Sequence, residues 1–210
     1  AAKPFAVLER VKTLTQITGG DIMSIFDKLK QPVAPGTVSA SNNTVQSQSF
    51  TFTALPESLS QMQALPEAAL DSPFQTAALT VCALCAYAAD KTIGAEMLNW
   101  LRGPRPLSGM DISFLNDRFR DRKTYVPFSY FKGAKPDNDY TPDEPYKLTI
   151  FTNPYSDDNE GYMKVFLESG GADNPREIVL RQRGSDGKWF LWEQFILVGI
   201  RDPKSADPWA

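Results

Sequence analysis

The sequence predicts an α+β domain in which N-terminal helices pack on a C-terminal antiparallel β-meander sheet. Between residues 56 and 122, apolar side chains recur at helical spacing and capping residues mark the helix starts. From residue 146 onward, short apolar or alternating runs are separated by turn residues, as in a meander of short strands. The chain has 210 residues, of which 42% are hydrophobic, so it can bury a core without disulfides or metals.

Composition divides the chain into a helical segment, a linker and the main domain. Residues 1–31 carry apolar side chains at helical spacing and are expected to form an N-terminal helical segment. Residues 32–44 are rich in Pro, Gly, Ser, Asn and Thr and are expected to form a linker. The α+β domain then comprises residues 45–210.

Capping residues define the helices of the main domain. Ser72 and Pro73 supply an N-cap and a first position for an Ala-rich helix that reaches Ala89. Because this helix is apolar nearly all round, we expect it at the centre of the core. The other elements expected before residue 146 are a strand over 45–53 with Phe50 and Phe52 on one face, a short helix over 59–65, a helix capped by Thr92, a helix capped by Ser108 or Asp111, and a short strand over 126–131.

The C-terminal strands should pair in sequence order, because short turns join them. In the last strand, Trp189, Phe190, Leu191 and Trp192 follow one another, so both faces of this strand should be covered. The cover of the second face is either another part of this chain, such as an N-terminal helix or the C-terminal tail, or a partner. The expected strands of the meander are 146–152, 162–168, 176–183 and 188–198.

The alternation of side chains gives the meander two different faces. The last hairpin closes over Asp186-Gly187 or over the loop 184–187, and the two registers differ by two residues, so the facing is the same. One face is aliphatic and should meet the helices. The other face is aromatic and basic, and a guanidinium stacked on a ring there contributes about 0.5 to 2 kcal/mol. The binding candidates on this face are Tyr162, Phe166, Arg181, Arg183, Phe190 and Trp192.

A second set of candidates lies at the end of the fourth expected helix. Arg118 and Arg122 are four residues apart, so they would lie on adjacent turns, beside Asp117 and Asp121. The segment is expected to be a solvated helix end with mixed ion pairs. The alternative is that Arg118 and Arg122 bind an anion through their planar donor forks.

Composition argues against several kinds of chemistry. The chain has no histidine, which excludes Ser-His-Asp and Cys-His catalysis and His-containing metal sites. Its net charge of -3 argues against non-specific nucleic-acid binding. Cys82 and Cys85 lie within the Ala-rich helix and are expected to be buried packing residues, and the acidic runs near 137–144 and 157–160 are expected to be turns. We therefore predict no catalytic residue, metal site or cofactor.

The C-terminal part of the chain carries a recognisable pattern. The stretch Gly187–Phe195 (GKWFLWEQF), followed by Gly199-Ile200-Arg201 and Lys204–Trp209 (KSADPW), resembles a bacterial domain family of unknown function. The similarity runs back to about Leu55. The resemblance implies a bacterial, cytoplasmic protein and assigns no activity. No apolar run is long enough for a membrane span, although the chain begins without Met, which leaves export open.

These observations favour a non-enzymatic protein- or peptide-interaction module. The alternative is a small-molecule-binding domain, or an enzyme, with a pocket between a curved sheet and the helices. A closed core with an exposed aromatic patch would favour the first reading. An apolar cavity containing a buried Asp, Glu or Arg would favour the second. The sequence does not indicate the oligomeric state.

Overall fold

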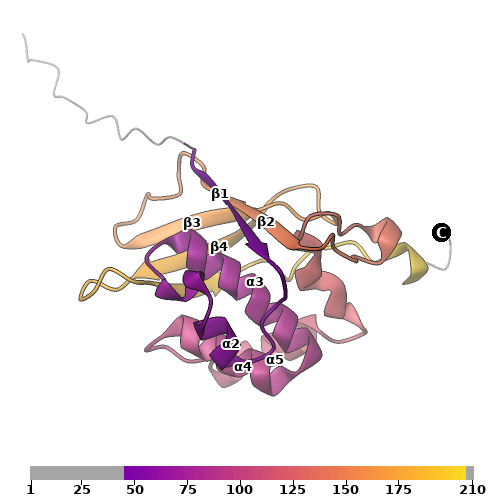
Figure 1. Cartoon of the computed structure of the whole chain (residues 1–210), viewed down its shortest axis with the longest axis horizontal. Coiled ribbons are helices and arrows are strands. Elements are labelled where there is room, and N and C mark those ends of the chain that lie inside the picture. Colours follow the sequence, from indigo (N-terminus) through magenta and orange to yellow (C-terminus); the bar gives the residue numbers. More distant parts are fainter. Residues whose placement is uncertain (1–44, 207–210) are drawn as a thin grey trace, which may run out of the picture. The chain divides into compact units, whose positions relative to one another are not determined.

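The computed structural model describes residues 45–206, which form a five-stranded antiparallel sheet with α-helices packed on one face (Figure 1). The strands follow one another in sequence order across the sheet, which confirms the α+β class and the meander. Helices precede strands from residue 59 on, whereas the first strand precedes the helices and pairs with the second. The helical segment predicted over 1–31 and the linker over 32–44 lie outside the described residues.

The elements agree with the expected ranges to within a few residues. The strands are β1 (Ser47–Phe52), β2 (Tyr146–Phe151), β3 (Tyr162–Leu167), β4 (Arg176–Gln182) and β5 (Trp189–Gln194). The α-helices of the described residues are α2 (Leu59–Gln63), α3 (Pro73–Ala89), α4 (Lys91–Arg102) and α5 (Gly109–Arg118). Short 3₁₀ segments cover Pro66–Ala69, Lys123–Tyr130, Pro136–Asn138 and Lys204–Ala206.

Helix α3 lies at the centre of the core, as its all-round apolar sequence predicts. Ser72 and Gln75 form a capping box at its start, and nearly every residue from Pro73 to Tyr87 is buried. Cys82 and Cys85 are buried free thiols in this helix, and burial raises the pKa of both. They are packing residues, since a thiol held neutral in an apolar core is unreactive.

Helix α4 crosses α3 closely, and its start differs from the prediction. Its N-cap is Asp90 rather than Thr92, because the Asp90 carboxylate accepts hydrogen bonds from the backbone N–H groups of Thr92 and Ile93. At the crossing, a Cβ added to Gly94 would lie 2.2 Å from the Cα of Tyr87. Only glycine therefore fits at this position.

The strand predicted over 126–131 is wrong, because these residues belong to the 3₁₀ segment Lys123–Tyr130. Pro127 lacks the N–H group that a strand would need for its ladder, and the Ser129 hydroxyl donates to the Val126 carbonyl within the turn. The Tyr130 hydroxyl donates to the carbonyl of Ile196. The apolar residues of this segment thus pack in the core without joining the sheet.

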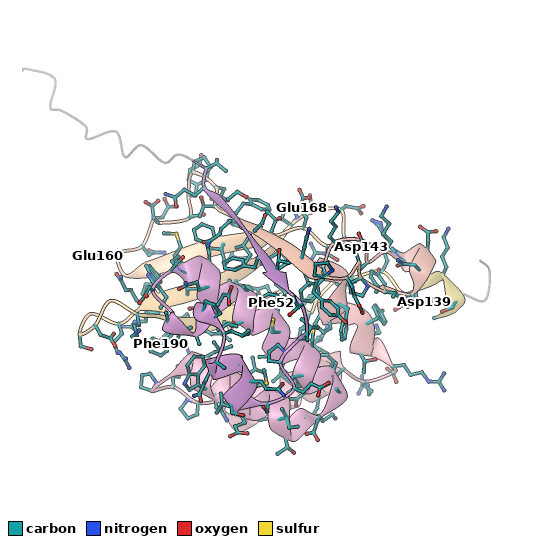
Figure 2. All side chains as sticks on the ribbon, viewed as in Figure 1. Phe52, Asp139, Asp143, Glu160, Glu168 and Phe190 are labelled. Carbon is teal, nitrogen blue, oxygen red and sulfur yellow. The ribbon has the colours of Figure 1, made fainter. Side chains whose placement is uncertain are left out.

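The inner face of the sheet is fully packed against the helices. Ile150, Leu167, Ile178 and Leu180 are each completely buried, as the predicted aliphatic face requires. Figure 2 shows Phe52 inside the domain, and the carboxylates labelled at its margin include the exposed Asp139, Glu160 and Glu168. Pockets open at the margins of this core, and core residues such as Leu84 and Leu98 contribute to their lining.

The last hairpin contains a β-bulge. Its loop covers residues 184–187, since the N–H groups of Arg183 and Gly187 bond to the carbonyls of Lys188 and Arg183. Beyond the loop, Leu180 pairs with Leu191 but Val179 pairs with Glu193. Trp192 is therefore the extra residue of the bulge, a feature that re-aims side chains beside functional sites.

Between residues 45 and 206, no helix combines the length and the apolarity needed to cross a membrane. Within the same residues, no group of three or more Cys, Asp or Glu side chains is placed to hold a metal ion.

Candidate functional site

Four side chains gather on the outer face of the sheet, and we call Tyr162, Arg181, Trp192 and Arg105 the Trp192 cluster. The rings of Tyr162 and Trp192 meet edge to face with centroids 5.5 Å apart. The Arg181 Cζ atom lies 5.1 Å from the Tyr162 centroid and 4.9 Å from that of Trp192. The Arg105 Cζ atom lies 4.1 Å from the Trp192 ring. Trp192 and Tyr162 are half-buried, whereas both arginines are exposed.

Strand pairing and one loop bring the cluster together. Tyr162 and Arg181 are direct cross-strand partners in β3 and β4, and the bulge adds Trp192 from β5. Arg105 comes from the connection between α4 and α5. The Nε–H of Arg102 donates to the Arg105 carbonyl over 3.0 Å and so holds this loop.

The same loop covers part of the second face of β5. Gly103 has φ of +60°, and a Cβ there would lie 2.6 Å from a ring carbon of Phe190, so glycine allows both the turn and the close contact. The C-terminal tail goes elsewhere, because the carbonyls of Val198 and Gly199 accept hydrogen bonds from Arg176 at the start of β4. Phe190 is thus covered by Gly103 and by Arg183, whose Cζ atom lies 4.5 Å from the centroid of its ring.

The arginines of the cluster have free hydrogen-bonding edges. Neither the Arg105 nor the Arg181 side chain makes a hydrogen bond or ion pair within the described residues, although both guanidinium faces contact rings. Stacking orients a guanidinium without using its N–H groups, which remain available for a carboxylate or phosphate. The cluster therefore offers an aromatic surface bordered by oriented donors.

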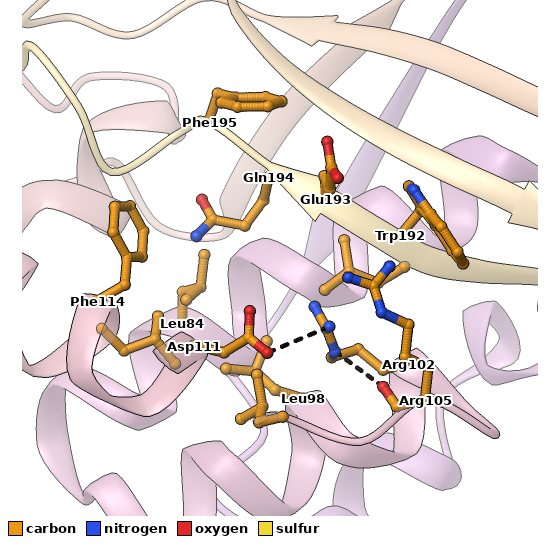
Figure 3. Close-up of a pocket in the computed structure, with 13 residues that line it drawn as sticks. Leu84, Leu98, Arg102, Arg105, Asp111, Phe114, Trp192, Glu193, Gln194 and Phe195 are labelled. Carbon is orange, nitrogen blue, oxygen red and sulfur yellow. Dashed lines mark hydrogen bonds and ion pairs between the residues drawn. The ribbon is translucent and has the colours of Figure 1, made fainter. Parts of the chain in front are cut away.

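A pocket of about 310 Å³ lies beside the cluster, between α4, α5 and the end of β5, and we call it the Arg102 pocket (Figure 3). Its rim carries Phe114 and Phe195, which are 37% and 47% exposed. Trp192 and Glu193 form its border with the outer face of the sheet. The apolar floor is formed by Leu84, Leu98, Leu107, Leu115 and Leu191.

Arg102 is the buried charge of this pocket. Its side chain is 7% exposed, its Nε–H donates to the Arg105 carbonyl, and its Nη2 lies 3.5 Å from an Asp111 oxygen. The Nη1 atom makes no hydrogen bond within the described residues. Burial lowers the pKa of Arg102 and the nearby Asp111 partly offsets this, but an arginine stays protonated at neutral pH.

Asp111 forms the capping box of α5 together with Ser108. Its Oδ2 accepts hydrogen bonds from the backbone N–H of Ser108 over 2.8 Å and from the Ser108 hydroxyl over 2.6 Å. Burial by itself would raise the pKa of Asp111, but the bonds from Ser108 and the charges of Arg102 and Arg105 outweigh it and lower the pKa. Asp111 is therefore ionised at neutral pH and unsuited to act as a general acid.

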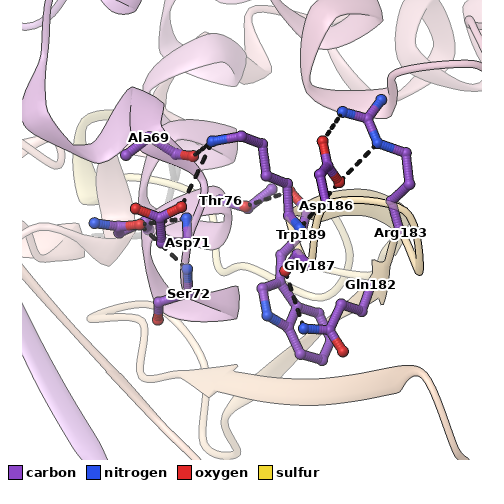
Figure 4. Close-up of polar contacts among 11 residues, drawn as sticks. Ala69, Asp71, Ser72, Thr76, Gln182, Arg183, Asp186, Gly187 and Trp189 are labelled. Atoms are coloured by element: carbon purple, nitrogen blue, oxygen red, sulfur yellow. Dashed lines mark hydrogen bonds and ion pairs between the residues drawn. The ribbon is translucent and has the colours of Figure 1, made fainter.

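The tip of the β4–β5 hairpin is internally satisfied (Figure 4). Arg183 lies over the Phe190 ring at 4.5 Å and forms a bidentate pair with Asp186. The Lys188 ammonium donates to the Ala69 carbonyl over 2.6 Å and lies 3.5 Å from Asp71. Arg183 and Phe190 therefore stabilise the hairpin and leave few free groups for a ligand.

The Arg183–Asp186 pair gives a testable pH dependence. The hydrogen bonds from Arg183 lower the pKa of Asp186 to about 2, below its value in an unfolded chain, so the pair stabilises the hairpin above about pH 4 and is lost as the pH falls through 2. Carboxyl NMR should give a midpoint near 2 for Asp186, and Arg183→Gln should return it to about 4. Lys204→Gln, which removes the partner of Asp137, should leave it unchanged. An unchanged midpoint in Arg183→Gln would contradict the assignment.

The remaining candidates lie apart from the cluster. Phe166 is at the other end of β3, with its ring 6.1 Å from Phe151. Arg118 pairs with Asp117 over 3.0 Å and lies over Phe114. Helix α5 ends at Arg118 and Arg122 has φ of +62°, so the two arginines do not share a helical surface as expected. The chain reverses after Phe119, which separates them.

Several residues of the site were not predicted from the sequence. Arg102 follows Leu98 by four residues and therefore lies on the apolar face of α4. A charged residue on the buried face of a helix indicates a functional site, because charges are rarely buried without a partner. Phe114, Phe195 and Arg105 carry no comparable signal, because their roles depend on tertiary contacts.

Comparison with known proteins assigns the domain. Residues 54–204 match the model of a family described as Domain of unknown function (DUF6935), and the match begins beside Leu55, as the C-terminal pattern predicts. No curated protein and no solved structure matches the chain. The matched region contains the Trp192 cluster and the Arg102 pocket and covers more than half of the sequence. The chain therefore belongs to the DUF6935 family.

Proposed function

We propose that this domain is a non-enzymatic interaction module that binds a peptide segment of a partner protein across the Trp192 cluster. One observation carries the proposal: Trp192 is half-buried between two arginines whose side chains lie over its ring and whose side-chain N–H groups have no polar partner between residues 45 and 206. Tryptophan and arginine are the residues that contribute most often to binding energy at protein interfaces. A peptide with apolar and acidic side chains matches both kinds of group.

The charges around the cluster favour a peptide over a nucleic acid. A depression of about 500 Å³ on the outer face joins Trp192 to Tyr162, and its lining includes the carboxylates of Asp158, Glu177 and Glu193. These charges would repel a phosphate backbone, while a peptide can match them locally. In the Arg102 pocket, the pKa of Asp111 is lowered, so this carboxyl is suited to ionic contacts and not to general acid catalysis.

Small-molecule binding is the second candidate, and the buried Arg102 beside the leucine floor of the Arg102 pocket is an observation that favours it. A largely apolar pocket of about 490 Å³ lies between α3, residues 53–57 and the start of β2, with Ala86, Ile93, Phe128 and Tyr146 in its lining. Its size suits a drug-sized apolar ligand. This pocket lies at the margin of the core, between a helix and the start of a strand. Bacterial origin and a cytoplasmic location stay predictions.

The test uses random dodecapeptides fused to the C-terminus of a phage coat protein, selected on the full chain. We expect enrichment of sequences that combine aromatic and acidic residues. Trp192→Ala should weaken binding of the selected peptides at least tenfold, which corresponds to about 1.4 kcal/mol. Because Trp192 is half-buried, the same change should lower the free energy of unfolding by only about 1 to 2 kcal/mol.

Tyr155→Ala is the matched control, since Tyr155 is an aromatic residue that is 70% exposed and lies outside the cluster. It should leave peptide binding unchanged. Selection of no sequence above background, or equal binding of the selected peptides by wild type and Trp192→Ala, would refute the proposed function. A stability loss of several kcal/mol in Trp192→Ala would instead identify Trp192 as a core residue.

A further inference from the structure

We infer that the Arg102 pocket receives the C-terminal residue of the bound peptide, with the α-carboxylate on Arg102 and Arg105 and an apolar side chain on the leucine floor. This inference rests on the proposed peptide-binding function and names the chemistry of the peptide end. It assigns a role to a pocket that shares Arg105 and Trp192 with the Trp192 cluster.

The hydrogen bonding of Arg102 is incomplete. Its side chain is more than nine-tenths buried, yet Nη1 has no hydrogen-bond partner within the described residues. Nη2 lies 3.5 Å from Asp111, and the charge of Glu193 also favours the protonated guanidinium without forming an ion pair with it. A buried charge costs several kcal/mol unless it is paired and hydrogen-bonded. Nη1 is not among the fully buried unpartnered atoms of the described residues, so it is open to the pocket, where an entering anion would supply an acceptor.

The Arg102 pocket contains charged side chains of both signs. Four charged residues line it, namely Arg102, Arg105, Asp111 and Glu193. Asp111 is already bound by Ser108, whereas Arg105 has no polar partner for its side chain. The two arginines therefore have unused donors for a carboxylate. The Glu193 carboxylate makes no hydrogen bond or ion pair within the described residues and can accept the last peptide N–H group.

The Arg102 pocket is small and combines a charged side with an apolar side. The pocket places an arginine beside a floor of leucine side chains within about 310 Å³, which is room for a single large residue. In a C-terminal residue, the carboxylate and the side chain leave the same Cα, so one small cavity holds both. An internal Asp or Glu brings only the carboxylate and would bury its flanking peptide groups against leucine without partners.

The Arg102 pocket is continuous with the surface around the Trp192 cluster. Trp192, Glu193 and Phe195 line both the Arg102 pocket and the outer-face depression that contains Tyr162. A peptide whose last residue lies in the pocket therefore passes over Trp192 onto the outer face. The two sites form one continuous surface on either side of β5.

The experiment compares two fluorescein-labelled pentapeptide pools, each with four randomised positions followed by phenylalanine, ending in a free carboxylate or in an amide. Fluorescence anisotropy with the full chain should show at least tenfold tighter binding of the free acid pool. Arg102→Gln should abolish the difference between the pools. Arg183→Gln should preserve it, because Arg183 is paired within the hairpin.

Arg105→Gln provides a second variant in case Arg102→Gln does not fold, since Arg105 is exposed. It should reduce the preference for the free acid at least threefold. Equal binding of both pools that still depends on Trp192 would overturn this inference and leave the proposed function standing. Failure of both pools to bind would also overturn it, and the phage selection then decides the proposed function separately.

Discussion

Gly94→Ala should lower the free energy of unfolding by about 3 kcal/mol, although alanine is the better helix former. The added Cβ would lie 2.2 Å from the Cα of Tyr87 and 2.4 Å from its backbone nitrogen. These are backbone atoms of α3, so no side-chain rotation relieves the contact. Helices α3 and α4 would have to separate, and the buried residues at their crossing would lose contacts. Urea unfolding followed by circular dichroism measures the change.

Gly109→Ala is the matched control for this prediction. Gly109 is the first residue of α5, and a Cβ there meets no atom within 4 Å. We expect its free energy of unfolding to stay the same or rise by up to about 1 kcal/mol, as helix propensity predicts. If Gly94→Ala also stabilised the protein, the close crossing of α3 and α4 would be disproved.

Leu180→Ala should cost about 3 to 4 kcal/mol, because Leu180 is completely buried on the inner face of the sheet. Truncating a buried leucine removes its transfer free energy and leaves a cavity that closely packed neighbours fill only in part. The pairing of Leu180 with Leu191 and with Met163 places it in the middle of the β3–β4–β5 sheet. Thermal and urea unfolding should both report the loss.

Arg181→Ala tests the opposite face at the next position. Arg181 is exposed and contacts only the rings of Tyr162 and Trp192, so its truncation should cost less than about 1 kcal/mol. Peptide binding should nevertheless weaken, because one of the two free guanidinium groups is lost. Equal stability losses in Leu180→Ala and Arg181→Ala would contradict the assignment of the two faces.

Local sequence patterns predicted most elements correctly, because each depends on neighbours along the chain. The Ser72 cap and the all-round apolar sequence of α3 gave its start and its central burial. Alternation in β3 separated the buried Val165 and Leu167 from the half-buried Lys164 and Phe166, since successive side chains of a strand point to opposite faces. The strand expected over 126–131 failed because Pro127 and tertiary packing outweighed an apolar pattern.

The aromatic and basic face was likewise present in the sequence, but its role as a site depended on the fold. Alternation alone put Tyr162, Arg181 and Trp192 on one face. Arg183 and Phe190 share that face. Arg183 pairs with Asp186 and Phe190 packs against Gly103, so both residues stabilise the hairpin instead of binding a ligand. The loops that pack on this face decide which of its aromatic side chains remain accessible to a partner.

The sequence by itself determined the α+β class, the strand order and the two faces of the meander, because backbone geometry fixes the periods of helices and strands. Only the tertiary structure brought Arg105 over Trp192 and buried Arg102 beside the leucine floor. Those contacts join residues far apart in the chain, and they depend on how α4 and its following loop pack against β5. No local pattern records such packing, which is why the pocket emerged only from the folded domain.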